Sequence, residues 1–265
     1  GDDEVLVAEA LELVGLISAT REEASPEQSG LNTVGAMLRR GSVDAAAGEL
    51  QRMEALADTP RRQVELGLAR GALLRAQGEP DAAAGALMDT LAQSRKLGLA
   101  WETGQSLFGL AIAHSLAGRL DLALTFLSEA EATARSAGFQ AEAVQYGLEM
   151  GKLAIRMDRI EVAEARLVAA RLALEGMEHP AAKASADELE GALRARQGRQ
   201  QEALVAYQSA LTYREARGHY ADAARVAVGL VRATSASDAR EGRRWEERAR
   251  VLFEQAGDPL GPAHV

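Results

Sequence analysis

A short phrase of residues recurs every forty positions along most of this 265-residue chain. It begins at Gly78, Gly118, Asp158 and Gly198, and an alanine stands five residues after each of them. A fixed period of this length is typical of stacked supersecondary units, each of which buries its apolar face against the next. The period therefore favours an extended solenoid over a single closed core.

Three further positions recur together with the phrase. A small residue stands seven positions before each turn, a bulky residue nine positions after it, and another small residue twelve positions after it. These positions hold Gly71, Ala111, Gly151 and Gly191, then Leu87, Leu127, Leu167 and Tyr207, then Thr90, Ala130, Ala170 and Ala210. Small residues let two helices approach closely, and a large one fills the space between them. The pattern predicts paired helices.

Periodicity within each repeat also predicts helices. Apolar residues recur at helical spacing from Val64 to Gln77 and from Asp81 to Arg95. Pro80 stands where a helix begins without losing a hydrogen bond. Glycines twenty residues after the turns suit the left-handed position just past a helix end, namely Gly98, Gly138 and Gly218. The sequence has no alternating β-branched runs that would indicate strands, so an all-α fold is predicted.

The combination of small residue, Gly-x-x-x-x-Ala turn, bulky residue and alanine resembles the tetratricopeptide repeat. The forty-residue version is similar to the repeats of bacterial signal-responsive regulators and of some scaffold proteins. For residues 26–257 the resemblance implies a right-handed superhelical solenoid of about six antiparallel helix pairs. Residues 1–25 are predicted to form an N-terminal capping or partial-repeat helix, and residues 258–265 a C-terminal tail.

Composition and charge exclude or disfavour several classes of function. The chain has no cysteine, which excludes disulfides and thiolate metal sites. Asp2, Asp3 and Glu4 stand where a secretory signal would carry positive charge, and no apolar run is long enough to span a bilayer. A net charge of −9 disfavours direct binding to nucleic acid or to an anionic membrane. We expect a cytoplasmic protein.

The search for chemistry returns no catalytic motif. The four histidines are scattered without metal-ligand spacing, and there is no phosphate-binding loop. His114 is expected to serve in packing or on the surface, and His179 and His219 at helix ends. Four carboxylates are typical of solvated helix faces: Glu161, Glu164, Glu188 and Glu190. The sequence therefore predicts a protein that is not an enzyme and uses no cofactor or metal.

The resemblance implies a binding groove on the concave face, lined by the first helix of each pair. The family's ligand-facing positions, transferred to this chain, select Gln105, Phe108, Ile112, Gln145, Lys152, Arg156, Arg196, Arg225 and Arg232. An apolar patch around Phe108 and Ile112 is thus followed by a basic series. The planar fork of arginine suits carboxylate or phosphate, so we expect a protein or peptide partner with an acidic segment. In the alternative interpretation, these cations only pair with neighbouring glutamates.

Three functions follow from these observations. The first is a protein- or peptide-binding scaffold that holds a partner segment in the groove. The second is the ligand-sensing module of a larger bacterial regulator. The third is self-association through a degenerate end of the array. The chaperone-binding carboxylate clamp of the family is not matched, because Gln105, Gly109, Gln145 and Glu149 stand at its positions.

Overall fold

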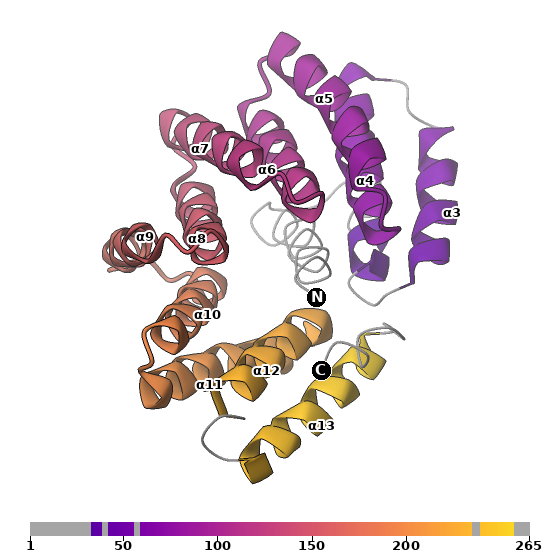
Figure 1. Ribbon diagram of the computed structural model, residues 1–265. Coiled ribbons are helices and arrows are strands. Elements are labelled where there is room, and N and C mark those ends of the chain that lie inside the picture. The colour runs from indigo at the N-terminus through magenta and orange to yellow at the C-terminus, as the bar shows by residue number, and fades with distance from the viewer. Residues whose placement is uncertain (1–32, 39–41, 56–58, 235–238, 257–265) are drawn as a thin grey trace. The chain divides into compact units, whose positions relative to one another are not determined.

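The computed structural model describes residues 33–38, 42–55, 59–234 and 239–256. These residues form helices joined by turns, which confirms the all-α prediction (Figure 1). The chain forms two compact units, residues 1–139 (unit 1) and 140–265 (unit 2). The helix predicted at residues 1–25 and the tail predicted at 258–265 lie outside the described residues.

The described part of unit 1 contains a helical segment at residues 33–38 and five longer helices. These are α3 (Val43–Glu54), α4 (Pro60–Ala76), α5 (Pro80–Lys96), α6 (Ala100–Leu116) and α7 (Leu120–Ser136). Each helix packs antiparallel against the next, and α4 also contacts α6. The first helices of successive pairs therefore lie against one another.

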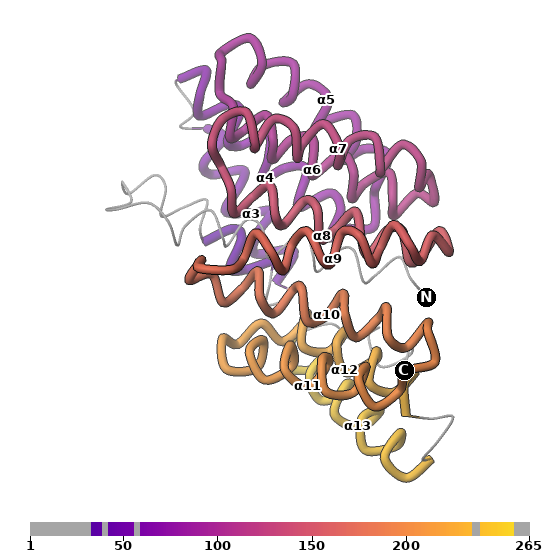
Figure 2. The backbone as a smooth tube through the Cα atoms, turned by 90° about the vertical axis from the view of Figure 1, so that its left-hand side faces the viewer, coloured from indigo at the N-terminus to yellow at the C-terminus, as the bar shows by residue number. Residues whose placement is uncertain are grey.

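Unit 2 repeats the arrangement with six helices in its described part. These are α8 (Gln140–Arg156), α9 (Ile160–Ala173), α10 (Pro180–Arg196), α11 (Gln200–Ala216), α12 (Tyr220–Thr234) and α13 (Ala239–Gln255). Neighbours along the chain pack in antiparallel pairs, as the tube in Figure 2 shows. Here α10 contacts both α8 and α12, so three first helices form one layer.

Most turns close with the same pair of hydrogen bonds. At the end of α4, Gly78 N–H donates to the carbonyl of Arg75 at 3.0 Å and Glu79 N–H to that of Leu74 at 2.9 Å. This is the Schellman closure, which places a left-handed residue just past the helix. It recurs at Gly98, Gly118, Gly138, Gly198 and Gly218 with positive φ, so the predicted helix stops are confirmed.

The turn after α9 differs from the others. The helix ends at Ala173, Gly176 takes the positive φ, and α10 begins only at Pro180. His179 caps α10, because its Nδ1 accepts a hydrogen bond from Ala182 N–H at 3.2 Å. The helix-end role predicted for His179 is therefore confirmed, and the longer turn keeps α10 in register with the repeat.

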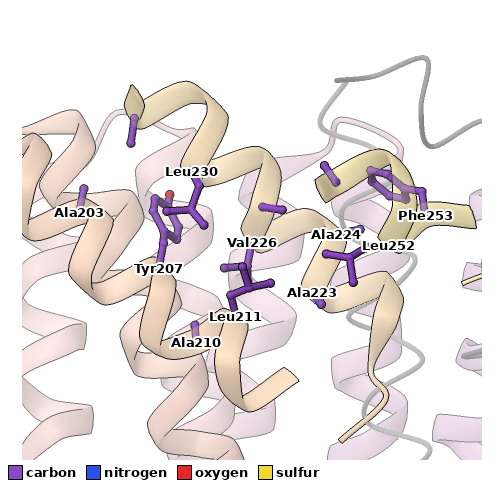
Figure 3. Close-up of a cluster of buried hydrophobic side chains, with 13 residues drawn as sticks. Ala203, Tyr207, Ala210, Leu211, Ala223, Ala224, Val226, Leu230, Leu252 and Phe253 are labelled. Carbon is purple, nitrogen blue, oxygen red and sulfur yellow. The ribbon is translucent and has the colours of Figure 1, made fainter. Parts of the chain in front are cut away.

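The positions shared by the repeats form the core. The alanines five residues after the turns, Ala83, Ala123, Ala163 and Ala203, are all fully buried. Tyr207 on α11 belongs to a buried cluster in which it lies beside Leu230 of α12 (Figure 3). A Cβ added at either Gly191 or Gly229 would lie 2.7 Å from the Tyr207 ring. Close approach of the helices thus depends on the absence of side chains there.

Asp158 is the exception among the residues that end the first helices. It takes the left-handed conformation with a φ of 57°, and Arg159 N–H donates to the carbonyl of Ala154 at 2.8 Å. Its carboxylate pairs with Arg196, but both side chains are more than half exposed. An exposed pair of this kind stabilises by only about 0–1 kcal/mol, whereas a left-handed residue with a Cβ costs roughly 1–2 kcal/mol.

Replacing Asp158 with glycine should therefore stabilise the protein. We expect Asp158→Gly to raise the free energy of unfolding by about 0.5–1 kcal/mol, after the ion pair and the greater chain entropy of glycine are allowed for. Asp158→Asn, which removes the charge but tolerates the left-handed region, should change stability by less. Denaturant unfolding measures both variants, and a less stable glycine variant would show that the ion pair outweighs the strain.

Candidate functional site

Three of the predicted groove residues lie on α6 in unit 1. Gln105, Phe108 and Ile112 are only 7%, 1% and 3% exposed. In this structure they are core residues, and most of α6 is buried with them. Their role as ligand contacts remains a prediction that would require movement of their surroundings.

The other six predicted residues lie on the first helices of unit 2. Gln145, Lys152 and Arg156 are on α8, Arg196 is the last residue of α10, and Arg225 and Arg232 are on α12. Arg196 and Arg232 are exposed, Gln145, Lys152 and Arg156 are half-buried, and Arg225 is buried. The structure thus divides the predicted basic series into an exposed and a buried set.

Lys152 and Arg225 of the predicted series, together with Arg214 of α11, lie around Glu188 of α10. Lys152 Nζ lies 3.1 Å from Glu188 Oε2, and Arg214 Nη2 of α11 lies 3.5 Å from the same oxygen. Arg225 Nη1 of α12 lies 3.9 Å from Glu188 Oε1. Four helices therefore bring three cations to one carboxylate.

Asp222 on α12 pairs with two of the same cations. It accepts a hydrogen bond from Arg225 and lies 3.4 Å from Arg214 Nη1. Arg214 also donates to Ser185 Oγ at 3.0 Å. The Arg214 side chain is 0% exposed, and a charge so far from water is tolerated only when it is paired. Glu188 and Asp222 provide that pairing.

Glu149 extends the cluster along α8. Its Oε1 lies 3.2 Å from Lys152 Nζ and accepts a hydrogen bond from Gln145 Nε2 at 3.0 Å. The Glu188 cluster is defined here as Glu149, Lys152, Glu188, Arg214, Asp222 and Arg225. These six residues carry three negative and three positive formal charges, so the set is neutral.

The charges of the cluster affect the pKa of its member Asp222 and of the neighbouring Tyr207. Burial alone would raise the pKa of Asp222, but the charges of Arg225 and Arg214 and the Arg225 hydrogen bond outweigh it and lower that pKa. Burial raises the pKa of Tyr207, and the nearby charge of Glu188 raises it further, against smaller opposing effects of Arg232 and Lys152. The core tyrosine of α11 therefore lies close to the charged layer.

The sequence analysis predicted only two of the six cluster residues as site residues, Lys152 and Arg225. Glu188 was expected on a solvated face, and that prediction is wrong, because the residue is buried among three cations. Arg214 carries a signal that could have identified it. The repeat places Ser94, Ala134 and Leu174 at the equivalent position, and all three are buried. A charge at such a position indicates a buried ion pair.

The remaining chemistry is sparse in the described part of the chain. Its histidines and acids form no group that could hold a metal ion. No described helix is long and apolar enough to cross a membrane. His114 stacks on Phe126 with ring centroids 5.2 Å apart, and it accepts a hydrogen bond from Arg119 Nε at 2.8 Å. The packing role expected for His114 is thus confirmed.

Removing the Asp222 carboxylate should lower the free energy of unfolding by an amount that depends on pH. Asp222→Asn leaves Arg214 and Arg225 short of an acid, so we expect a loss of about 3–5 kcal/mol in the free energy of unfolding at pH 7. Because folding lowers the pKa of Asp222, the stabilisation is present above about pH 4 and is lost as the pH falls further. The difference between wild type and variant should therefore shrink between about pH 4 and pH 2.

Asp81→Asn is the matched control, because Asp81 is 81% exposed and pairs with Arg119 on the surface. It should change stability by less than about 1 kcal/mol at pH 7. Urea unfolding as a function of pH measures both variants. A gap for Asp222→Asn that is small, or that stays constant on acidification, would contradict the assignment.

No family model and no curated protein sequence matches the chain. Solved structures do match it. A Rap protein complexed with competence and sporulation factor has a TM-score of 0.71 at 14% identity, over 98% of this chain and 78% of that one.

Two further structures resemble this chain in the same way. The Rap conjugation gene regulator of plasmid pLS20, in complex with the Phr* peptide, has a TM-score of 0.71 at 16% identity, over 97% of this chain and 71% of that one. NprR in complex with its cognate peptide NprX has a TM-score of 0.62 at 15% identity, over 93% and 71%. At these identities the likeness concerns the fold, and the chain has the tetratricopeptide-repeat-like fold of these regulators.

Proposed function

We propose that the chain is a peptide- or protein-binding module whose exposed arginines in unit 2 hold an acidic segment of the partner. The fold supports the peptide class, because the similar Rap and NprR structures were solved with bound peptides. In this proposal the chain acts by binding and not by catalysis. The buried Glu188 cluster holds the helices, and the exposed cations meet the ligand.

The observation that carries the proposal is that each first helix in the described part of unit 2 has an arginine in its last turn. Arg156 ends α8 and Arg196 ends α10, forty residues apart in the repeat. Arg232 on α12 occupies the repeat position of Ala192, one helical turn before Arg196. The Glu188 cluster ties the same three helices together. Side chains in this arrangement suit successive carboxylates on an extended or helical peptide.

The energetics favour exchange at this surface. Arg196 pairs with Asp158, and the two side chains are 51% and 77% exposed. Such a pair contributes only about 0–1 kcal/mol, so a ligand carboxylate replaces Asp158 at little cost. The cations of the buried cluster are different, because removing an acid from Arg214 would leave a buried charge. Binding is therefore expected at Arg196 and Arg232 while the cluster stays intact.

A sensing role within a larger regulator is the second candidate. It is favoured by one observation, namely that a similar structure is described as a conjugation gene regulator with a bound peptide. Both candidates share the same peptide-binding step. They differ in the consequence of binding: a scaffold only holds its partner, whereas a sensing module changes the activity of other domains of the regulator.

Charge reversal at the exposed arginines tests the binding step. The probe is a fluorescein-labelled ten-residue peptide of alternating glutamate and leucine, and the readout is fluorescence anisotropy at two salt concentrations. We expect Arg196→Glu with Arg232→Glu to weaken binding at least tenfold, because both attractions become repulsions. Added salt should weaken the wild-type complex, since exposed charges are screened over about 10 Å at 0.1 M ionic strength.

The control changes the same net charge elsewhere in unit 2. Arg199 and Arg250 are exposed and lie at the start of α11 and on α13, so Arg199→Glu with Arg250→Glu should bind the probe nearly as the wild type does. A lysine–leucine peptide of the same length should bind far more weakly. Equal losses in the two double variants would show that only net charge matters, and the proposed surface would be wrong.

A further inference from the structure

Among the described residues, Arg75 on α4 in unit 1 is a buried cation that has no acidic partner. It is 4% exposed, and its one hydrogen bond within the described residues runs from Nη1 to the carbonyl of Gly109 at a long 3.4 Å. Its Nε is also buried, and no described residue forms a hydrogen bond with it. Within the part of the chain that the structure describes, no carboxylate forms an ion pair with this guanidinium. Arg75 therefore differs from Arg214, which is buried between two acids.

The repeat shows that this charge is not required for packing. The positions forty, eighty and one hundred and twenty residues later hold Ser115, Ile155 and Ala195, which are small or apolar. The turn after Arg75 closes with the same hydrogen bonds as the turns after those residues. The fold accepts serine or alanine at this position, so packing alone does not explain why a charged arginine stands there.

The backbone of α6 makes room for the guanidinium. A Cβ added at Gly109 would lie 2.9 Å from Arg75 Nη1 and 3.0 Å from Leu87 Cδ1. Arg75 thus lies directly against the α6 backbone where a side chain is missing. Gln105 and Ile112 stand four residues before and three after Gly109, so they flank this place on the same helix face.

A charge held in this way is unfavourable unless something compensates it. Withdrawal from water lowers the pKa of Arg75 to about 9, which still leaves the group charged at neutral pH. Buried charges in proteins are normally paired, and arginine offers a planar set of donors that matches carboxylate and phosphate. The unused Nε and the long Nη1 contact leave donors available for such a group.

We propose that Arg75 anchors an oxyanion-binding site in unit 1, filled by a carboxylate or phosphate group of a ligand. The site goes beyond the exposed arginines of unit 2, because it uses a different helix layer and a buried donor. Entry requires a local movement of side chains, since only 4% of Arg75 is exposed. Small anions are therefore the appropriate first probes.

The experiment measures thermal and urea unfolding of the full chain in rising concentrations of sodium phosphate or sodium acetate, at constant ionic strength kept with sodium chloride. A ligand that binds only the folded state shifts the unfolding equilibrium about tenfold at ten times its Kd. We expect a saturable shift in wild type that is absent in Arg75→Met. Arg70→Met should keep the shift, because Arg70 is an exposed residue of the same helix paired with Glu54.

The two anions distinguish the source of the oxyanion. A larger response to acetate assigns the site to a carboxylate, such as that of a peptide, and a larger response to phosphate assigns it to a phosphorylated ligand. Without added anion, Arg75→Met should be at least as stable as wild type, because it removes an uncompensated charge.

Three results would overturn the proposal. These are no response of wild type to either anion up to about 50 mM, an equal response in Arg75→Met, or a loss of stability in Arg75→Met without anion. The last would assign the guanidinium to packing against Gly109. Arg196 and Arg232 lie in unit 2, so a negative result for Arg75 does not contradict the proposed peptide surface. A negative result for the peptide surface likewise does not contradict the Arg75 site.

Discussion

A large side chain on the second helix of a pair packs against two glycines, one in its own pair and one in the next. Leu87 meets Gly71 and Gly109 in unit 1, and Tyr207 meets Gly191 and Gly229 in unit 2. The contact joins three helices at once, so it sets how closely consecutive first helices approach. Van der Waals attraction is effective only at such short range, and interiors tolerate few voids. The approach of α4 to α6 in unit 1 and of α10 to α12 in unit 2 depends on this contact.

The positions of the charged residues in unit 2 depend on the packing of the first helices. Because α10 contacts both α8 and α12, Lys152 and Arg225 come within ion-pair distance of Glu188 although the three residues are far apart in the sequence. Tyr207 lies at the boundary between the packed glycines and the charged residues. Its ring fills the space between the glycines, and its pKa is raised by burial and, to a smaller extent, by the charge of Glu188.

The fold was accessible from the sequence because its signals are local and repeated. Glycine at a left-handed position and alanine at a close contact report on backbone geometry within one repeat, and four copies remove the ambiguity. Asp158 shows the limit of such signals, since register alone places it among the glycines and only the structure reveals its positive φ. The shortened α9 is a second departure from the pattern, because Glu178 stands where other repeats have glycine and Gly176 takes the positive φ two residues earlier.

The site was less accessible because ion pairs depend on contacts between repeats. Position counting found Lys152 and Arg225 but gave no reason to choose Glu188 or Asp222 as their partners. It also assigned Phe108 and Ile112 to a groove, whereas both are buried in the structure. The stronger signal was a charge at a repeat position that is otherwise small or apolar. Arg214 and Arg75 both carry it. In the part of the chain that the structure describes, Arg214 has acids beside it and Arg75 has none.

A double-mutant cycle at the glycine contact tests the central claim most directly. The end of the Tyr207 ring meets Gly229, while Cγ and Cδ1 meet Gly191. Gly229→Ala should lose about 1–3 kcal/mol of unfolding free energy through overpacking, although alanine gains about 1 kcal/mol in helix propensity. In a Tyr207→Leu background that loss should disappear, whereas Gly191→Ala should remain costly. Gly85→Ala, with nothing within 4 Å, should stabilise. Additive effects of Gly229→Ala and Tyr207→Leu would contradict the account.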